Sequence, residues 1–201
     1  MFGDPIENPN NLPVYTIGQT TKDILSGQCL NGEPRRMRPG EKAVLKVSAV
    51  TYGYFKEDEY KVLQDQSQIT KNLYPQKGDL LFSRANTKEY VGATCLVEQD
   101  YPDLLLPDKL WKLVCNDFVM PVYMKMYLSM PVVRGLVSEQ ATGTSGSMFN
   151  ISMAKLRELP ILLPSIPEQK KFVAFYEQTD KSKYTGQRAS YTTMRGGELC
   201  A

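Results

Sequence analysis

The segment Leu159–Phe172, LPILLPSIPEQKKF, places prolines on both sides of a short apolar run and then becomes charged. Proline disfavours a helix interior because it lacks an amide hydrogen and its ring clashes with the preceding turn. Pro160 and Pro164 therefore bracket a short buried strand, whereas Pro167 is compatible with the first turn of a following helix. The segment predicts a stiff connection that fixes the direction in which a terminal helix leaves a globular domain.

Upstream of this junction the hydrophobic pattern changes once. Runs rich in β-branched and aromatic residues, separated by turns, predict short strands at residues 12–18, 43–55, 80–83, 92–97 and 109–115, and the segment EDEYKVL at 57–63 is predicted as an exposed turn that returns into another strand. The run at 109–115 alternates apolar and polar residues, as a half-buried strand does. One helical turn is predicted at residues 20–27, where Thr20 or Thr21 can cap it and Gly27 can end it.

Helical patterns dominate after residue 120. Residues 120–140 are dense in methionine, leucine, valine and tyrosine and predict a helix that Pro131 kinks or divides. Ser152 can cap a short helix that follows it. The sequence thus predicts a mixed α/β (α+β) domain of short twisted strands with a few helices, followed by a C-terminal helix.

The terminal helix is predicted from Glu168 to about Lys183, a length of about 24 Å at 1.5 Å per residue. Its apolar stripe contains Phe172, Val173 and Tyr176. The helical periodicity is then lost, and a disordered tail is expected. The predicted parts are a domain at residues 1–165, the helix at 166–183 and the tail at 184–201.

Composition sets the class of protein. The chain has 201 residues, of which 42% are hydrophobic and 23% charged, and these are ordinary values for a soluble globular protein. No apolar run approaches the roughly 18–20 residues that span a bilayer, and the N-terminus lacks the pattern of a secretory signal. We therefore expect a cytoplasmic protein without a membrane partner. The formal net charge of +2 does not by itself indicate a nucleic-acid partner.

The residues that most catalytic sites require are missing from the sequence. There is no histidine, and the cysteines show no CxxC spacing, so no zinc site, redox pair or histidine-dependent triad is predicted. The motifs of amino-methyltransferases and P-loop proteins are absent. The tripeptides EYK at 59–61 and EQK at 168–170 match a nuclease motif only by letter, since one lies in a charged turn and the other begins a helix. We expect a protein without catalytic residues, metal or cofactor.

Polar side chains follow the predicted strand at residues 80–83. Arg84, Asn86, Thr87 and Lys88 come immediately after it. Arginine pairs with guanine and asparagine with adenine in the major groove, whereas threonine and lysine suit phosphates. An exposed β-turn of a protein that does not bind DNA would have a similar composition, so the residue types alone leave both interpretations open.

Further segments have the composition of phosphate contacts. The turn EPRRMRPGEK at 33–42 is basic, and the stretch ATGTSGS at 141–147 offers hydroxyls and free backbone amides. Either segment is equally compatible with a solvated surface loop. The candidate phosphate contacts are Arg35, Arg36, Arg38, Lys109, Ser145 and Ser147.

Several segments in this order resemble one family. They are MFGDPIENPN, KGDLLFSRANT, VGATCLV, DKLWKL and GTSGSMFNISMAKLRELPILLPSIPEQKKF. Over roughly residues 1–183 the chain resembles the specificity subunit of type I restriction–modification enzymes. The resemblance implies a non-catalytic subunit whose target recognition domain binds one half of a split double-stranded DNA target. It further implies that methyltransferase and restriction (translocase) subunits dock on it.

Two departures from the family pattern bear on assembly. Full-length members are expected to have two recognition domains joined by long, antiparallel spacer helices, whereas this chain contains one domain and a short helix. It therefore resembles a second half of such a subunit or a natural half-subunit, which a second copy could complete through the spacer helix. The predicted subunit interface comprises Gln169, Phe172, Val173 and Tyr176.

Two functions follow from these observations. The first is a DNA-recognition subunit that contacts base edges and phosphates with the residues named above. The alternative is a protein-interaction module or vestigial fragment that does not bind DNA on its own, which the mild net charge and the short helix favour.

Overall fold

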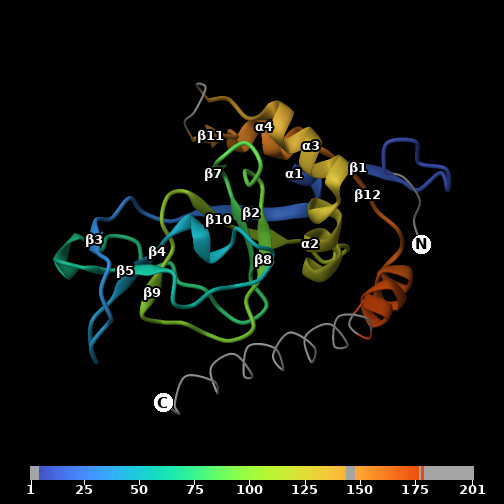
Figure 1. Cartoon of the computed structure of the whole chain (residues 1–201). Coiled ribbons are helices and arrows are strands. Elements are labelled where there is room, and N and C mark those ends of the chain that lie inside the picture. Colours follow the sequence, from blue (N-terminus) through green and yellow to red (C-terminus); the bar gives the residue numbers. More distant parts are fainter. Residues whose placement is uncertain (1–4, 144–147, 177, 179–201) are drawn as a thin grey trace, which may run out of the picture.

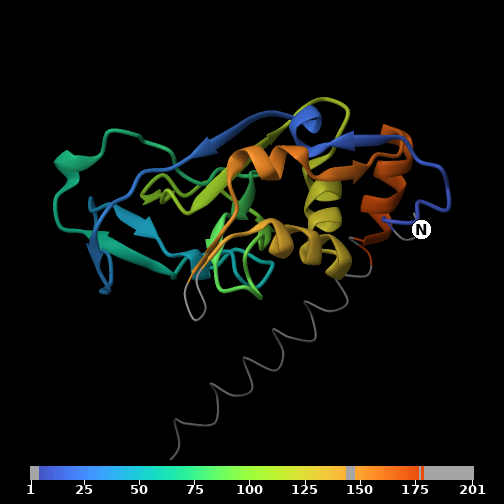
Figure 2. The ribbon, with the colours of Figure 1, turned by 90° about the horizontal axis from the view of Figure 1, so that it is seen from above.

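A computed structural model describes residues 5–143, 148–176 and 178. Figures 1 and 2 show a central sheet with helices α2 and α3 at one end and a smaller sheet at the other end. No described helix is both long and apolar enough to cross a membrane. The predicted tail at 184–201 and the predicted end of the terminal helix lie outside these residues, apart from residue 178.

The central sheet is antiparallel with the strand order β2-β10-β6-β8. These strands span Thr21–Ser26, Leu110–Cys115, Leu80–Ser83 and Thr94–Leu96. The predicted helical turn at 20–27 is wrong, because this segment pairs with β10, Ile24 lying opposite Leu113. The helical turn comes earlier, at α1 (Ile17–Thr20), where Thr16 and Gln19 form a capping box.

Strand β10 is buried on both faces rather than half-buried as its alternation predicts. Lys112 points to a covered face, where its Nζ lies 2.6 Å from a carboxylate oxygen of Asp79 and donates to Gln76. The ion pair lets a lysine occupy an interior position, since a buried charge needs a partner. The ion pair therefore allows a lysine at a buried position of β10 where the alternation predicts an exposed one.

A second sheet has the order β3-β5-β4-β9. Its strands span Gly32–Glu33, Tyr60–Leu63, Ala43–Leu45 and Leu104–Leu105. The predicted strand at 43–55 is mostly wrong: it stops at Leu45 and continues as a 3₁₀ turn, η1 (Val47–Ala49), and a loop through Gly53 with φ of 84°. A second 3₁₀ turn, η2, spans Gln66–Gln68.

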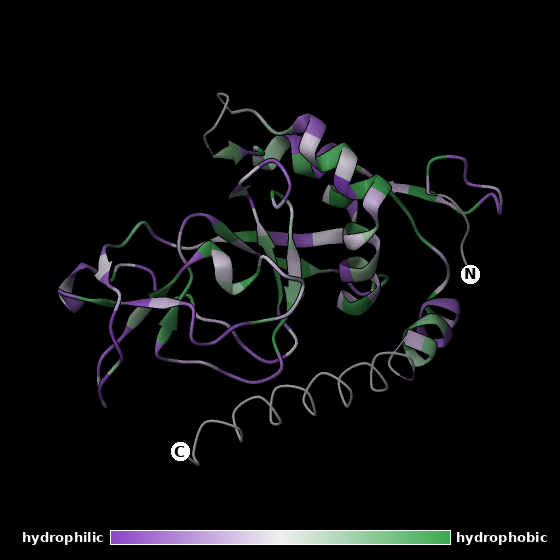
Figure 3. Cartoon of the chain, viewed as in Figure 1, coloured by the Kyte–Doolittle hydropathy of each residue, from purple (hydrophilic) through white to green (hydrophobic). Residues whose placement is uncertain are grey.

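The helical part agrees with the sequence prediction. Pro131 divides the helix into α2 (Pro121–Ser129) and α3 (Pro131–Gln140), with Met130 in an extended conformation between them. The Ser152 hydroxyl accepts a hydrogen bond from the amide of Lys155 and caps α4 (Met153–Glu158). In Figure 3 the interior strands are mostly hydrophobic and the outer turns hydrophilic, and the largest apolar cluster fills the space between the central sheet and these helices.

The proline-rich junction forms the predicted strand. β12 (Pro160–Leu162) pairs antiparallel with β1 (Val14–Thr16), and a helix over residues 166–176 follows at once. The Ser165 amide and hydroxyl both bond to the Glu168 carboxylate, which fixes the first turn of this helix. The strand pairing and these hydrogen bonds hold the junction between the domain and the helix, and its stiffness stays a prediction.

Gln169 attaches the terminal helix to its own domain. The side chain is fully buried, its oxygen accepts from the Met120 amide at 2.8 Å, and its nitrogen donates to the carbonyls of Phe118 and Pro164 at 3.0 and 2.8 Å. A subunit interface at Gln169 is not compatible with this position, because no part of the side chain reaches the surface.

The rest of the predicted interface also faces inward. Phe172 packs edge-on against Tyr123 of α2, Val173 is buried, and the Tyr176 hydroxyl accepts from Lys125. The apolar stripe of the helix is thus occupied by α2 of the same chain.

Replacement of Gln169 by alanine should destabilise the domain. It leaves the Pro164 carbonyl, which is buried, and the partly buried Met120 amide and Phe118 carbonyl without these partners, and we expect the free energy of unfolding in urea to fall by about 2–3 kcal/mol. The exposed neighbour provides a matched control, since Lys170→Ala should change it by less than about 0.5 kcal/mol. Equal unfolding midpoints for the two variants would contradict this role of Gln169.

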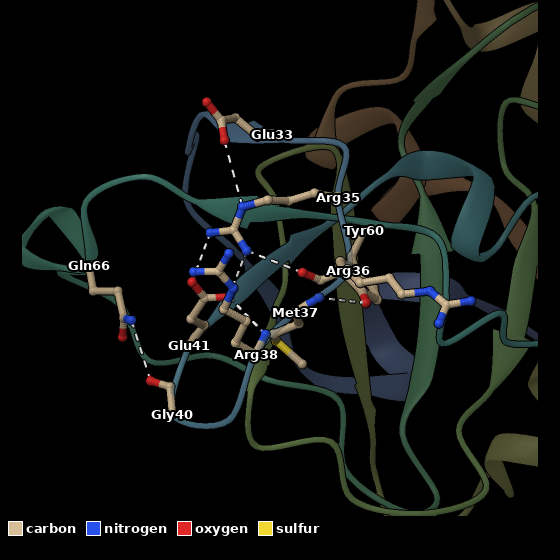
Figure 4. A network of polar contacts seen from close by, with 9 residues as sticks. All are labelled: Glu33, Arg35, Arg36, Met37, Arg38, Gly40, Glu41, Tyr60 and Gln66. Carbon is tan, nitrogen blue, oxygen red and sulfur yellow. Dashed lines mark hydrogen bonds and ion pairs between the residues drawn. The ribbon is translucent and has the colours of Figure 1, made fainter.

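The basic turn at residues 34–41 is organised by Glu41 (Figure 4). Its carboxylate accepts two hydrogen bonds from the Arg35 guanidinium, at 2.7 and 2.8 Å, and one from the Arg38 amide. The hydrogen bonds from Arg35 and then from Arg38 lower the pKa of Glu41 to about 2. The ionised carboxylate is therefore part of the folded turn.

The stability that Glu41 contributes should depend on pH. Because its pKa is lower in the folded state than its ordinary value of 4.5, the contribution is complete above that value and is lost as the pH falls toward about 2. We expect Glu41→Gln to lower the free energy of unfolding at pH 7, and the difference from the unmodified chain to disappear over that window. Glu139→Gln, at an exposed position of α3 where the carboxylate forms no ion pair with a described residue, should show no such trend in urea titrations.

Candidate nucleic-acid interface

The candidate base-contacting segment follows β6 directly. The chain passes from Ser83 through Arg84 into β7 (Ala85–Asn86), which pairs with β11 (Phe149–Asn150). The Arg84 amide donates to the Lys109 carbonyl at 3.1 Å, and the Arg84 carbonyl accepts from the Ile151 amide at 3.0 Å. The backbone of Arg84 is therefore held from both sides.

The tip of this loop rests on α3. The Thr87 carbonyl accepts from the amides of Tyr90 and Val91, which closes a turn. The Arg134 guanidinium donates to the Glu89 carbonyl at 2.9 Å and the Ser138 hydroxyl to the Lys88 carbonyl at 3.1 Å. The side chains of Thr87 and Lys88 are exposed at this fixed tip.

Arg84 is half-buried beside an aromatic ring. Its guanidinium carbon lies 5.6 Å from the centre of the Trp111 ring, and its Nε is buried without a hydrogen-bond partner among the described residues. An arginine stacked in this way loses less side-chain entropy when it forms a bidentate pair.

Asn86 is more enclosed than its sequence position predicts. The side chain is 8% exposed, its nitrogen donates to the Thr51 hydroxyl at 3.1 Å, and its oxygen accepts from the Thr87 amide. In this conformation the carboxamide joins the loop to the turn after η1. A contact between Asn86 and a base remains a prediction and requires these bonds to break.

One more predicted contact belongs to the same neighbourhood. Lys109 is half-buried and supplies the carbonyl that holds Arg84. Thr142 and Asn150 exchange backbone hydrogen bonds, so the start of the hydroxyl-rich stretch lies beside β11, the strand that pairs with β7. Ser145 and Ser147 themselves are outside the described residues.

The basic turn lies elsewhere, beside β3 and β5 at the far end of the smaller sheet (Figure 1). Arg35 is engaged by Glu41, and it also lies 3.6 Å from Glu33. Arg36 is exposed, and Figure 4 shows its side chain pointing away from Glu41. Arg36 and Arg38 therefore retain positive charge for a ligand, whereas that of Arg35 is neutralised.

A groove that the sequence does not predict lies beside the loop. About 440 Å³ of open space is bounded by the turn at Thr51–Gly53, by the loop and β8, and by the α2–α3 corner. Tyr52 and Tyr54 are 56% and 46% exposed, and the Lys56 ammonium lies 4.5 Å from the Tyr52 ring centre. The sequence predicts a strand over this segment, although the glycine between two tyrosines is a signal that favours an exposed turn.

The described residues contain no group of histidine, cysteine and acidic side chains that could hold a metal ion. Burial raises the pKa of the Cys95 and Cys115 thiols to about 12, so both are protonated and poor nucleophiles at neutral pH. The polar side chains of this surface can offer hydrogen bonds and charge to a ligand.

Comparison with known sequences identifies curated relatives, although no family model matches the chain. The specificity subunit of the Escherichia coli type I restriction enzyme EcoEI is 30% identical over 199 residues, 94% of this chain and 33% of the relative. The EcoKI specificity subunit of E. coli strain K12 is 30% identical over 152 residues, 74% of this chain and 32% of the relative. The chain therefore spans about a third of the length of these proteins.

Solved structures show the same fold. A chain from a structure concerned with complex assembly of the type I R-M system aligns with a TM-score of 0.61 at 18% identity, over 92% of this chain and 42% of that one. The HsdS subunit from Thermoanaerobacter tengcongensis gives 0.60 at 17% identity, over 90% and 40%. In sequence and in fold, over the third of their length that it spans, this chain belongs to the specificity subunits of type I restriction enzymes.

Proposed function

We propose that the chain is a non-catalytic DNA-specificity subunit that binds one half-site of a split target in a type I restriction–modification complex. The observation that carries the proposal is the loop from Arg84 to Tyr90, which presents exposed polar side chains from a backbone fixed at Lys109, Ile151 and α3. Sequence discrimination requires donors and acceptors at defined positions, and a loop fixed in this way loses little entropy on binding.

The base contacts are assigned to Arg84, Asn86, Thr87 and Lys88. Arg84 is the strongest member, because its guanidinium is oriented by the Trp111 ring. Since its Nε is buried, a bidentate pair with guanine would use the two terminal nitrogens of the guanidinium. Thr87 and Lys88 are exposed at the tip of the loop.

The phosphate contacts are assigned to the charged and hydroxyl side chains away from the tip. Arg36 and Arg38 are exposed and lie outside the ion pairs of the basic turn. Arg35 contributes only by holding that turn through Glu41. The remaining members are Lys109, Ser145 and Ser147.

We further propose that methyltransferase and restriction subunits assemble on the chain, and that a second copy completes the split target. Since the apolar stripe of the terminal helix packs on α2, docking uses the opposite side of this helix. Lys170, Lys171 and Phe175 are exposed there, Phe175 to 57%.

Selection of bound duplexes from a random pool, with the methyltransferase subunit added, tests the recognition role. We expect the recovered duplexes to share a short motif with a defined half-site. Retention of no duplex at low or moderate salt would contradict it and favour the protein-interaction alternative.

Arg84→Ala should relax the base preference at one position of the selected motif. We expect a cost of about 1–3 kcal/mol for the preferred base there and little change for duplexes that lack it. Arg36→Ala is the matched control, and it should weaken all duplexes alike. A uniform loss with Arg84→Ala, at an unchanged unfolding midpoint, would make Arg84 a phosphate contact instead.

A further inference from the structure

The groove beside the loop combines cations with exposed aromatic rings. Lys56 lies between two tyrosines, 4.5 Å from the ring centre of Tyr52 and 5.5 Å from that of Tyr54. No ion pair between described residues involves Lys56. The ring contacts restrict the flexible side chain and hold its ammonium next to Tyr52, which is one of the residues that line the groove.

Arg134 supplies a second cation in the wall of the groove. Its guanidinium donates to the Glu89 carbonyl, and it forms no ion pair with a described carboxylate. Burial lowers its pKa, which reports the cost of partly removing this charge from water. An anion in the groove would offset that cost.

Hydroxyl groups and one carboxylate complete the lining. The hydroxyls of Thr94 and Ser129 lie 3.3 Å apart in the groove. Glu89 is the acidic member, and its charge is the main cause that raises the pKa of Tyr90. The carboxylate is thus close to the Tyr90 hydroxyl, and with Lys56 and Arg134 the groove and its rim keep a net positive charge.

Hydrogen bonds and a ring contact join the groove to the candidate base-contacting loop. Asn86 bonds to Thr51 on one side, and Arg134 bonds to the Glu89 carbonyl on the other. The Tyr52 and Tyr90 rings, one from each side, lie with their centres 5.9 Å apart. A strand seated in the groove would therefore be placed relative to Thr87 and Lys88.

We propose that this groove binds a phosphodiester of the DNA backbone, with Lys56 and Arg134 as the charged contacts, next to the base pairs that the loop contacts. The inference rests on the proposed DNA-binding function and adds a site to it. The site contributes affinity and register without base preference, because phosphates carry no sequence information.

Lys56→Gln tests the site in the full chain. We expect affinity for both the selected duplex and an unrelated duplex to fall about five- to tenfold near 0.1 M salt, and the slope of log K against log salt to decrease by about 0.9. Lys61→Gln, on the exposed side of β5, removes the same charge and should change neither quantity. Identical behaviour of the two variants, while the unmodified chain binds DNA, would overturn the groove site and leave the proposed function intact.

Arg134→Gln and Arg134→Lys test the second contact. We expect the glutamine variant to lose a similar part of the salt slope and the lysine variant to retain it, with unfolding midpoints recorded for each. If neither variant folds, Lys56→Gln decides. Loss of affinity for the selected duplex alone would overturn the phosphate assignment in favour of a base contact.

A free phosphate ion shares the chemistry of the backbone phosphate. Replacing chloride by inorganic phosphate at equal ionic strength should leave DNA affinity unchanged if the site is built for the polymer. Saturable competition by phosphate that Lys56→Gln abolishes would assign the groove to a small anion and overturn the backbone assignment. Failure of the unmodified chain to bind any duplex would overturn both this site and the proposed function.

Discussion

The candidate interface depends on the two backbone hydrogen bonds of Arg84. One joins it to Lys109, at the start of the central strand β10, and the other to Ile151, just before α4. Bonds in opposite directions fix both the position and the tilt of the peptide, so the next few residues leave the sheet along one path. A loop attached only at its ends would sample many conformations and lose that freedom on binding.

Charge in this protein is informative only after ion pairs are assigned. The net charge of +2 is small, and the densest basic cluster, at 34–41, has its first arginine neutralised by Glu41. Near the loop the arrangement differs: Arg84, Lys56 and Arg134 each interact with a ring or a carbonyl and form no ion pair with a described carboxylate. Contacts with rings and carbonyls orient a cation and leave its charge available, which is a useful property in a surface that meets phosphate.

Local chemistry explains which elements were predictable. Pro131 divides the helix, Ser152 caps α4 and the prolines at 160–167 frame a strand, because each effect acts within about one turn of the residue that causes it. Strand β2 was missed because its identity comes from pairing with β10, roughly ninety residues away. The enclosure of Asn86 has the same origin: its partner Thr51 belongs to a distant turn, and no periodicity in either segment reports their contact.

Gln169 is a polar residue within the apolar stripe of the terminal helix, and the sequence is compatible with two roles for it. On a spacer helix such a residue could specify pairing with another helix, and sequence alone does not distinguish this from attachment to the parent domain. In the structure the carboxamide is attached to its own domain. Its oxygen accepts a hydrogen bond from the Met120 amide, and its nitrogen donates to the carbonyls of Phe118 and Pro164. These hydrogen bonds attach the helix to the domain, and replacing them with bonds to a partner chain would cost a large free energy. The domain therefore sets the direction of the helix. The proposed role in binding one half of a split DNA target would require this rigidity at the start of the terminal helix, because an angular error there grows with distance along the helix.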